Sequence, residues 1–132
     1  MRVIVTGSRD WTGVYATWRI HTILELVLAL ADALGRKLTV VHGDCPTGAD
    51  RTVDNWARRR ENIGVSVESL PADWRALGKR AGPIRNRAMI ERGADMCIGF
   101  VKGESKGTRI TLAMAQEAGI STFTVPWEED RE

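Results

Sequence analysis

The sequence predicts an α/β fold with a mostly parallel, doubly wound sheet of about five strands and helices on both faces. Short runs of β-branched residues alternate with longer amphipathic segments, and this alternation is typical of β-α-β units. Glycine-rich stretches follow several of the runs, as expected for loops at one edge of a parallel sheet. The 132 residues are 43% hydrophobic, which suits one domain of ordinary size.

The predicted elements alternate from the first strand to the last. β-branched runs at 3–6 and 38–41 indicate buried parallel strands. Between them, a hydrophobic stripe from Ile20 to Leu34 has helical spacing and ends at Gly35. The pattern then predicts a helix over 49–60, a strand over 65–70, a helix from Pro83, a strand over 95–100, a helix from Gly107 and a strand over 122–125. Right-handed crossovers make this a Rossmann-like domain with a crevice at the carboxyl ends of the strands.

We expect one domain over residues 1–127 and a solvated acidic tail over 128–132. The longest connection without an obvious element runs from Pro71 to Gly82, and long connections are often functional. The apolar stretch from Ile20 to Leu34 contains charged residues and is too short to span a membrane. No signal peptide precedes the first strand, so we expect a soluble, cytoplasmic protein that does not act at a membrane.

Charge and cysteine content narrow the classes of partner. The net charge is only +2, so the chain lacks a protein-wide field for nucleic acid, and we do not expect nucleic acid as a partner. The two cysteines, Cys45 and Cys97, are too few for a disulfide framework or a tetrahedral metal site. We therefore expect no metal and no cofactor.

Cations crowd a predicted helix start between Gly78 and Met89. Gly82 suits the cap and Pro83 the first helical position, so Arg85 and Arg87 fall in the first turn, with Lys79 just before it. A helix start carries partial positive charge, and each Arg there costs up to roughly 1 kcal/mol unless an anion lies nearby. The segment, including Asn86, therefore predicts a bound phosphate. The alternative is that these side chains reach solvent or pair with carboxylates.

Three further loops should meet this segment at the same edge of the sheet. Glycines allow close approach of the backbone, while hydroxyls and helix-start amides donate to phosphate oxygens. The candidate ligand-binding residues of these loops are Gly7, Ser8, Arg9, Asp10 and Trp11, then His42, Gly43, Asp44, Gly48, Ala49 and Asp50, and finally Gly107 and Thr108. Together they predict a phosphorylated ligand, although each loop alone also suits an ordinary turn.

Two common nucleotide motifs are absent from these loops. The first strand is not followed by G-x-G-x-x-G, and the loop from Gly43 to Gly48 is not followed by Lys-Ser or Lys-Thr. Ordinary dinucleotide-binding and nucleoside-triphosphatase sites are therefore disfavoured.

Aromatic and titratable residues offer further candidates, each with a structural alternative. Trp11 and Trp74 lie in loops near the crevice, where a ring could stack on a base. His42 follows a buried strand, so it is either a polar core residue or a ligand contact. Asp50 either favours its own helix start or binds a ribose hydroxyl, and we favour the second.

Taken together, these loops resemble the SLOG superfamily, most closely its small YspA-like, YpsA-related branch of bacteria and phages. The matching pieces are Gly7-Ser8-Arg9, His42-Gly43-Asp44, Gly48-Ala49-Asp50, Gly82-Pro83-Ile84-Arg85-Asn86 and Gly107-Thr108. The resemblance implies a Rossmann-like domain that binds nucleotides or nucleotide-derived small molecules between the glycine-rich loops and the Arg-Asn helix start.

The relatives that this resemblance implies differ in activity. Some bind ligands, some handle DNA like DNA-processing protein A, and some are phosphoribohydrolases like the cytokinin-activating LOG enzymes. The hydrolases carry P-G-G-x-G-T-x-x-E, whose Glu works on the ribosyl bond. Here Thr111 stands at the Glu position, and Asp44, Asp50 and Glu104 are the candidate substitutes. The catalytic residues, if the protein is an enzyme, are unknown at this stage.

Our leading hypothesis is therefore a module that senses or sequesters a mononucleotide or an ADP-ribose-like signal. An effector protein is a candidate partner, because the chain has no separate effector domain. Leu26 and Leu28 flank the stripe of the first helix and indicate either a subunit contact in a homo-oligomer or a helix buried within its own domain. The alternatives are an N-glycosidic hydrolase of nucleoside monophosphates, and single-stranded DNA binding supported only by the cations near Trp74.

Overall fold

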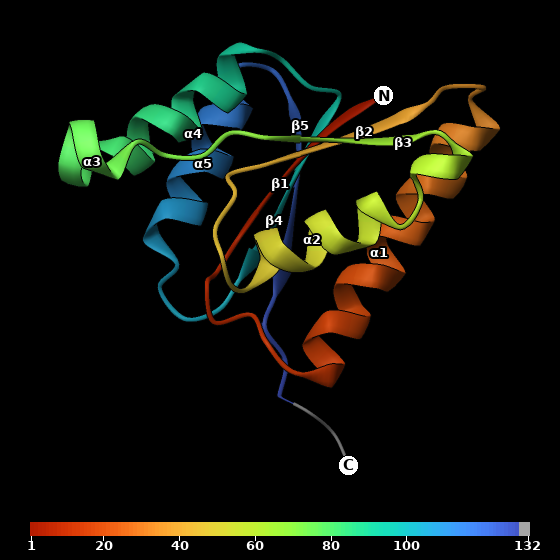
Figure 1. The fold of residues 1–132 in the computed structure, drawn as a ribbon, viewed down its shortest axis with the longest axis horizontal. Helices are drawn as coiled ribbons and strands as arrows, with labels where there is room; N and C mark the ends of the chain where they lie inside the picture. Colours follow the sequence, from red (N-terminus) through yellow and green to blue (C-terminus); the bar gives the residue numbers. More distant parts are fainter. Residues whose placement is uncertain (130–132) are drawn as a thin grey trace.

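Five parallel strands form one sheet between two layers of helices in the computed structural model, which describes residues 1–129 (Figure 1). The strand order is β3-β2-β1-β4-β5. The strands are β1 (Arg2–Gly7), β2 (Leu38–His42), β3 (Val65–Ser69), β4 (Met96–Val101) and β5 (Ser121–Pro126). The helices are α1 (Val14–Ala33), α2 (Ala49–Arg58), α3 (Trp74–Leu77), α4 (Ala81–Glu91) and α5 (Lys106–Glu117), with 3₁₀ turns at Glu61–Ile63 and Gly78–Arg80. The predicted fold class is confirmed.

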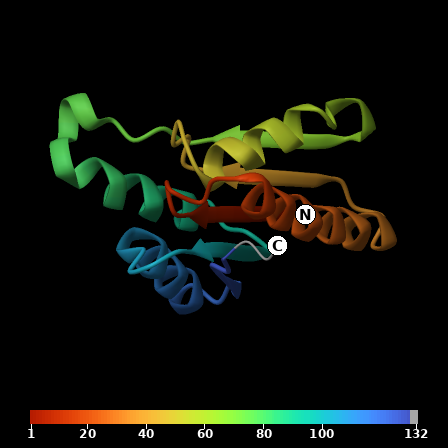
Figure 2. The ribbon, with the colours of Figure 1, turned by 90° about the horizontal axis from the view of Figure 1, so that it is seen from below.

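Each face of the sheet has its own hydrophobic core. On one face, Ile20 and Leu24 of α1 and Trp56 of α2 pack against alternate residues of the central strands. On the other, Met89 of α4 and Leu112 of α5 pack against the residues between them. Figures 1 and 2 show these two helical layers on opposite sides of the strands. Burying each large side chain stabilises the fold by about 1.5–3 kcal/mol, and this pattern fixes which side of each strand faces which helix.

The order in which the chain adds strands to the sheet reverses between β1 and β4, although all the strands stay parallel. The chain runs from β1 through β2 to β3 at one edge, then crosses to β4 on the other side of β1. At such a reversal the loops leave the strands in opposite directions and open a crevice at their carboxyl ends. The loops after β1, β2 and β4 therefore meet at one edge, as the sequence predicts.

The connection after β3 differs from the prediction. Residues 71–82 include α3, whose first turn is capped by the Asp73 side chain accepting from the Ala76 amide at 3.1 Å. The 3₁₀ turn Gly78–Arg80 leads directly into α4, which begins at Ala81, two residues before Pro83. Pro83 is tolerated because its missing N–H falls among the first amides, which have no intrahelical acceptor. Placing Arg85 and Arg87 in the first turn was wrong, because both lie beyond it.

Helix α1 is longer than the predicted apolar stretch. It spans 20 residues and is long and apolar enough to meet the length and hydropathy criterion for a membrane span, so the expectation that it is too short was wrong. A core helix of a soluble protein meets the same criterion. One face of α1, which includes Ile20, Leu24 and Val27, packs against the sheet.

The end of the chain is only partly described. The boundary at residue 127 stays a prediction. The Tyr15 hydroxyl donates to Glu128 Oε2 at 3.0 Å, so the first residue of the predicted tail contacts α1. Residues 130–132 of that tail lie outside the described residues.

Candidate functional site

A cleft of about 690 Å³ opens at the carboxyl edge of the sheet. It lies where the strand order reverses, and α3, α4 and α5 enclose it together with the loops after β1 and β2. Twelve predicted residues line it: Gly7, Ser8, Arg9, Gly43, Asp44, Asp50, Gly82, Pro83, Arg85, Asn86, Gly107 and Thr108. The candidate Trp74 also lines it, and the other lining residues are Thr6, Cys45, Pro46, Pro71, Ala72, Met89, Ser105, Lys106 and Ile110.

The start of α5 forms one end of the cleft. Ser105 precedes the helix in the left-handed region, with φ 41°. The Lys102 amide donates to both Ser8 Oγ and Ser105 Oγ at 3.0 Å, and the two hydroxyls also contact each other. No described side chain caps the helix, and its first turn contains no acid. The first amides of a helix have no intrahelical acceptor, so this corner suits an anion.

Lys106 places a cation beside those amides. It is exposed and lines the cleft together with the buried Thr108. The charge conflict that the sequence predicts at α4 therefore occurs at α5, where a lysine occupies the first helical position. The sequence analysis identified Gly107 and Thr108 as candidate ligand-binding residues but missed Lys106, although it directly precedes them.

Arg85 ties α4 to the neighbouring loops. Its guanidinium donates to the carbonyl oxygen of Gly43, and its Nε donates to Asn86 Oδ1 at 2.7 Å. A Cβ on Gly43 would overlap the guanidinium, which explains the glycine there. Burial lowers the pKa of Arg85, but a guanidinium keeps its charge in proteins. Arg85 thus binds carbonyl oxygens rather than solvent or a carboxylate, and still lines the cleft.

Two buried carboxyls of α2 have different surroundings. Asp50 is 7% exposed, lines the cleft and accepts from the Cys45 amide at 3.1 Å. Burial raises its pKa, although the nearby positive charge of Arg85 opposes the rise, and Asp50 forms no direct salt bridge within residues 1–129. Asp54 is also buried, and burial alone would raise its pKa, but hydrogen bonds from Arg58 and His42 hold that pKa below its ordinary value. Asp50 therefore remains available to a hydroxyl donor in the cleft.

His42 is a polar core residue, which decides between its two interpretations. Its side chain is fully buried. Its Nε2 lies 2.8 Å from Asp54 Oδ1, and its Nδ1 accepts from the Asp44 amide at 2.9 Å. The hydrogen-bond network assigns the proton to Nε2. His42 holds the loop after β2 in place but does not line the cleft, so its assignment as a ligand contact was wrong.

The two candidate tryptophans differ in exposure, and only one of them reaches the cleft. Trp11 is fully buried, its Nε1 donates to the Ala16 carbonyl at 2.9 Å, and its ring centroid lies 5.1 Å from those of Phe100 and Trp127. Its stacking on a ligand was therefore a wrong prediction, because the loop after β1 folds back under α1. Trp74 is 48% exposed and lines the cleft.

The ring of Trp74 bridges two walls of the cleft. A Cβ on Gly82 would lie 3.1 Å from Trp74 Cη2, so the ring covers the start of α4 closely. The Arg9 guanidinium carbon lies 5.7 Å from the ring centroid, within the range of a cation–π contact.

The remaining predicted residues lie beside the cleft rather than in its lining. Gly48 has φ 75°, and a Cβ there would overlap the backbone of Ser8 and Arg9. Ala49 is fully buried against Gly7. These two residues bring the loops after β1 and β2 together without lining the cleft. Asp10 and Lys79 are exposed outside its lining, so their assignment to the site stays a prediction.

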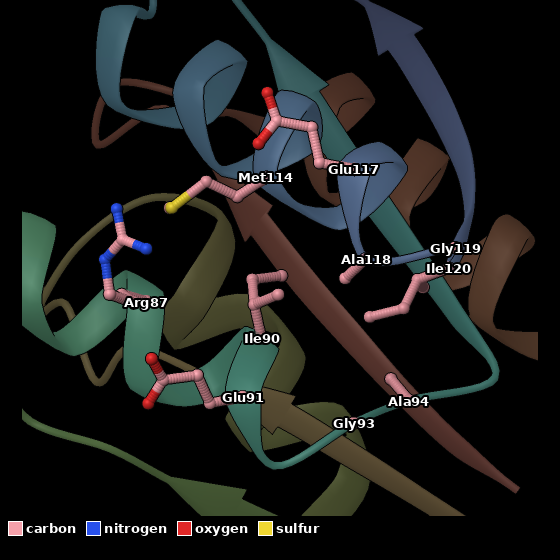
Figure 3. Close-up of a pocket in the computed structure, with 10 residues that line it drawn as sticks. All are labelled: Arg87, Ile90, Glu91, Gly93, Ala94, Met114, Glu117, Ala118, Gly119 and Ile120. Atoms are coloured by element: carbon pink, nitrogen blue, oxygen red, sulfur yellow. The ribbon is translucent and has the colours of Figure 1, made fainter.

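A second hollow, of about 570 Å³, lies between the carboxyl ends of α4 and α5. Figure 3 shows Ile90, Met114 and Ile120 within it and the carboxylates of Glu91 and Glu117 at its rim. Helix carboxyl ends carry partial negative charge and disfavour anions. No group of three His, Cys, Asp or Glu side chains within residues 1–129 is arranged to hold a metal ion.

Comparison with known proteins gives two matches. The sequence profile of the YspA, cpYpsA-related SLOG family matches residues 1–77, which include the loops after β1 and β2 and helix α3. The chain is also 44% identical over 124 residues to the Gene 61 protein of Mycobacterium phage D29, covering 90% of this chain and 91% of that protein. No solved structure matches the chain.

Proposed function

The chain belongs to the YspA, cpYpsA-related SLOG family, and from this premise we propose that its cleft binds a mononucleotide or an ADP-ribose-like molecule. Membership itself indicates a nucleotide-related binding role or a LOG-like role. One observation carries the finer proposal: a single cleft joins an uncapped helix start to an exposed tryptophan ring.

The phosphate binds at the start of α5 in this proposal. The amides of residues 106–108 and the hydroxyls of Ser8 and Thr108 supply donors, and Lys106 supplies a positive charge. Ser105 and Ser8 are already held by the Lys102 amide, so this corner needs little rearrangement to receive an oxyanion.

The nucleoside extends from this corner along the cleft. Asp50 accepts a hydrogen bond from a ribose hydroxyl, because its buried carboxyl lines the wall and forms no direct salt bridge within residues 1–129. The base stacks on Trp74, whose half-exposed ring is the aromatic surface of the lining. The protein then sequesters the ligand, or senses it and reports it to an effector protein.

A thermal-shift panel with native mass spectrometry tests the proposal. The panel holds mononucleotides, ADP-ribose, NAD and cyclic nucleotides, with inorganic phosphate as a reference for the phosphate corner alone. A ligand at a hundredfold excess over its Kd stabilises the fold by about 2.7 kcal/mol, which the panel detects. Absence of any bound nucleotide-derived ligand would overturn the proposal.

A second candidate function is N-glycosidic hydrolysis of a nucleoside monophosphate, and the position of Asp50 favours it. Thr111 occupies the position of the LOG-type Glu. Its side chain is fully buried, donates to the Gly107 carbonyl at 2.9 Å and does not line the cleft. Burial raises the pKa of Asp50, which suits a general acid. Asp50 would give its proton to the base nitrogen as the bond from C1′ to that nitrogen breaks, and a water molecule would add its oxygen to C1′ and return one proton to the Asp50 carboxylate.

Chromatography of the free base decides between binding and hydrolysis. Base release by the native chain that disappears in Asp50→Asn supports hydrolysis, with Asp54→Asn as the matched control in the same helix. Binding without base release above a heat-killed control assigns the cleft to binding alone.

A further inference from the structure

Arg9 is a cation of the cleft that the fold itself does not neutralise. Its side chain lines the cleft and forms no hydrogen bond or salt bridge within residues 1–129. The neighbouring acids have other partners. The Asp10 carboxylate lies 3.8 Å from Lys102 Nζ. The Asp44 carboxylate, which also lines the cleft, lies 3.5 Å from Arg51 Nη2. A charge left unpaired in a cleft is available to a ligand of opposite charge.

The loop after β1 holds the backbone of Arg9 next to the start of α5. The preceding residue, Ser8, contacts the Ser105 hydroxyl there. The Arg9 carbonyl accepts from Thr47 Oγ1 at 3.1 Å, and a Cβ on Gly48 would overlap the Arg9 backbone. Since consecutive Cα atoms are about 3.8 Å apart, the Arg9 side chain begins beside the corner that receives the phosphate. Its flexible stem alone decides where the guanidinium lies.

The guanidinium of Arg9 lies on the Trp74 side of this corner. Its carbon is 5.7 Å from the centroid of the half-exposed Trp74 ring. A cation–π contact at an exposed site is weaker than a charge-assisted hydrogen bond to a phosphate oxygen. A phosphate between the corner and Trp74 would therefore draw the guanidinium off the ring. The same movement would uncover the ring for the base.

Arg85 gives a second reason to expect an anion on this side of the cleft. Burial lowers the pKa of Arg85, and the positive charge of Arg9 adds to that lowering, whereas the carboxyl of Asp50 opposes it. The two guanidiniums therefore lie close enough to repel each other, and both line the cleft. An anion near both replaces this repulsion with attraction, and the planar fork of arginine suits phosphate oxygens.

Resting on the proposed function, we propose that the cleft holds two linked phosphate groups, so that its ligand is a nucleoside 5′-diphosphate or an ester of one. The first phosphate lies at the start of α5, and Arg9 binds the second, on the side toward Trp74. The two phosphates are adjacent in the ligand because Ser8 and Arg9, which serve them, are adjacent in the chain. Arg9 thereby distinguishes a diphosphate from a monophosphate.

Isothermal titration calorimetry with AMP and ADP tests this selection. The native chain should bind ADP at least about tenfold more tightly than AMP, the size of one charge-assisted hydrogen bond. Arg9→Gln should abolish the preference while changing the AMP affinity by less than about threefold. Arg75→Gln is the matched control and should keep the preference, because Arg75 is an exposed cation of α3 outside the cleft lining. Inorganic pyrophosphate compared with inorganic phosphate should give the same pattern without a base.

Three results would overturn the proposal. They are equal binding of AMP and ADP by the native chain, equal losses of both nucleotides in an Arg9→Gln variant with native circular dichroism, and loss of the preference in Arg75→Gln. Nucleotide binding persists in each case, so the proposed function survives them. Binding of nothing in the nucleotide panel would instead overturn the proposed function, and this proposal with it.

Discussion

The cleft and the hollow of Figure 3 lie at opposite ends of the same two helices, and their chemistry is opposite. The cleft adjoins the starts of α4 and α5, whereas the hollow of Figure 3 adjoins their carboxyl ends. Their volumes are similar, about 690 and 570 Å³. At the starts, amides of α5 are uncapped. At the ends, the carbonyls of Ala88 and Ile90 already accept from Arg92 and Gly93. Helix direction, rather than size, therefore decides which hollow can hold a phosphate.

The two hollows also differ in how the chain builds them. The cleft draws its lining from four separate stretches of the sequence, which include Ser8, Asp50, Trp74 and Lys106. The other hollow is built from the ends of α4 and α5 and the turns that follow them, and its charged groups, including Arg87, Glu91 and Glu117, are exposed. Convergence of polar groups from distant loops is typical of ligand sites.

Reversing one charge at each end should give the largest contrast. Lys106→Glu places an anion beside the uncapped start of α5, and we expect nucleotide affinity to fall by about a hundredfold, the size of a lost charge-assisted hydrogen bond. Arg87→Glu makes the same reversal in the other hollow and should leave affinity nearly unchanged. Isothermal titration calorimetry measures both. Equal losses in the two variants would remove the distinction between the hollows.

Removing the aromatic wall should have a smaller effect. Trp74→Ala should weaken nucleotide binding by about tenfold, within the range of one lost base-stacking contact. Binding of inorganic phosphate should not change, because phosphate reaches only the α5 corner. Titration of the same variant with both probes separates the two parts of the cleft. A parallel loss of phosphate binding would place Trp74 in the phosphate corner instead.

The pH dependence of stability should distinguish the two carboxyls of α2. Because burial raises the pKa of Asp50, the folded state holds this proton more tightly than the unfolded state. Stability is therefore lost as the pH rises from the ordinary value of 3.8 through the raised one. Asp50→Asn should remove that loss and therefore stabilise the fold at neutral pH relative to the native chain.

Asp54 should show the opposite sign in the same experiment. Its pKa is lowered, so its contribution is present above 3.8 and is lost as the pH falls through the lowered value. Asp54→Asn should therefore destabilise the fold at neutral pH. Thermal unfolding across the acidic range measures both variants, and the same sign for both would contradict the described surroundings of these carboxyls.

The smallest expected effect is a change in the rate at which Cys45 is labelled when nucleotide is bound. Cys45 lines the cleft and is half-buried, whereas Cys97 lies in the core beneath α4 and α5, where burial raises its pKa to about 12. Iodoacetamide should label Cys45 and spare Cys97 until the chain unfolds, because the thiolate is the reactive form. A bound nucleotide should slow labelling of Cys45 a few-fold. Protection of neither cysteine by a ligand that binds tightly would place that ligand outside the cleft.

Much of the fold could be predicted because its signals are local. β-branched runs mark the strands, and Gly7 and Gly43 mark where two of them end. Parallel alternation then requires the loops after β1, β2 and β4 to share one edge. This reasoning alone brings most of the predicted ligand-binding residues into the cleft.

The errors concern properties that tertiary packing decides. Trp11 and Trp74 both follow strands in polar loops, and no local pattern indicates that one ring packs against Phe100 while the other stays half-exposed. Helix α4 begins at Ala81, earlier than the predicted start at Pro83, because the 3₁₀ turn Gly78–Arg80 continues directly into the helix. The His42 side chain is buried because Asp54 of α2 provides a buried hydrogen-bond partner for it.

Phosphate binding at the start of α5 is tested most directly by titrating the ¹⁵N-labelled chain with a nucleoside monophosphate and following the amide and indole chemical shifts. We expect the largest shifts at the amides of Lys106, Gly107 and Thr108 and at the Trp74 indole, with no shift at the amides of Glu91 and Gly119. Shifts confined to the ends of α4 and α5, or no shifts at saturating nucleotide, would contradict it.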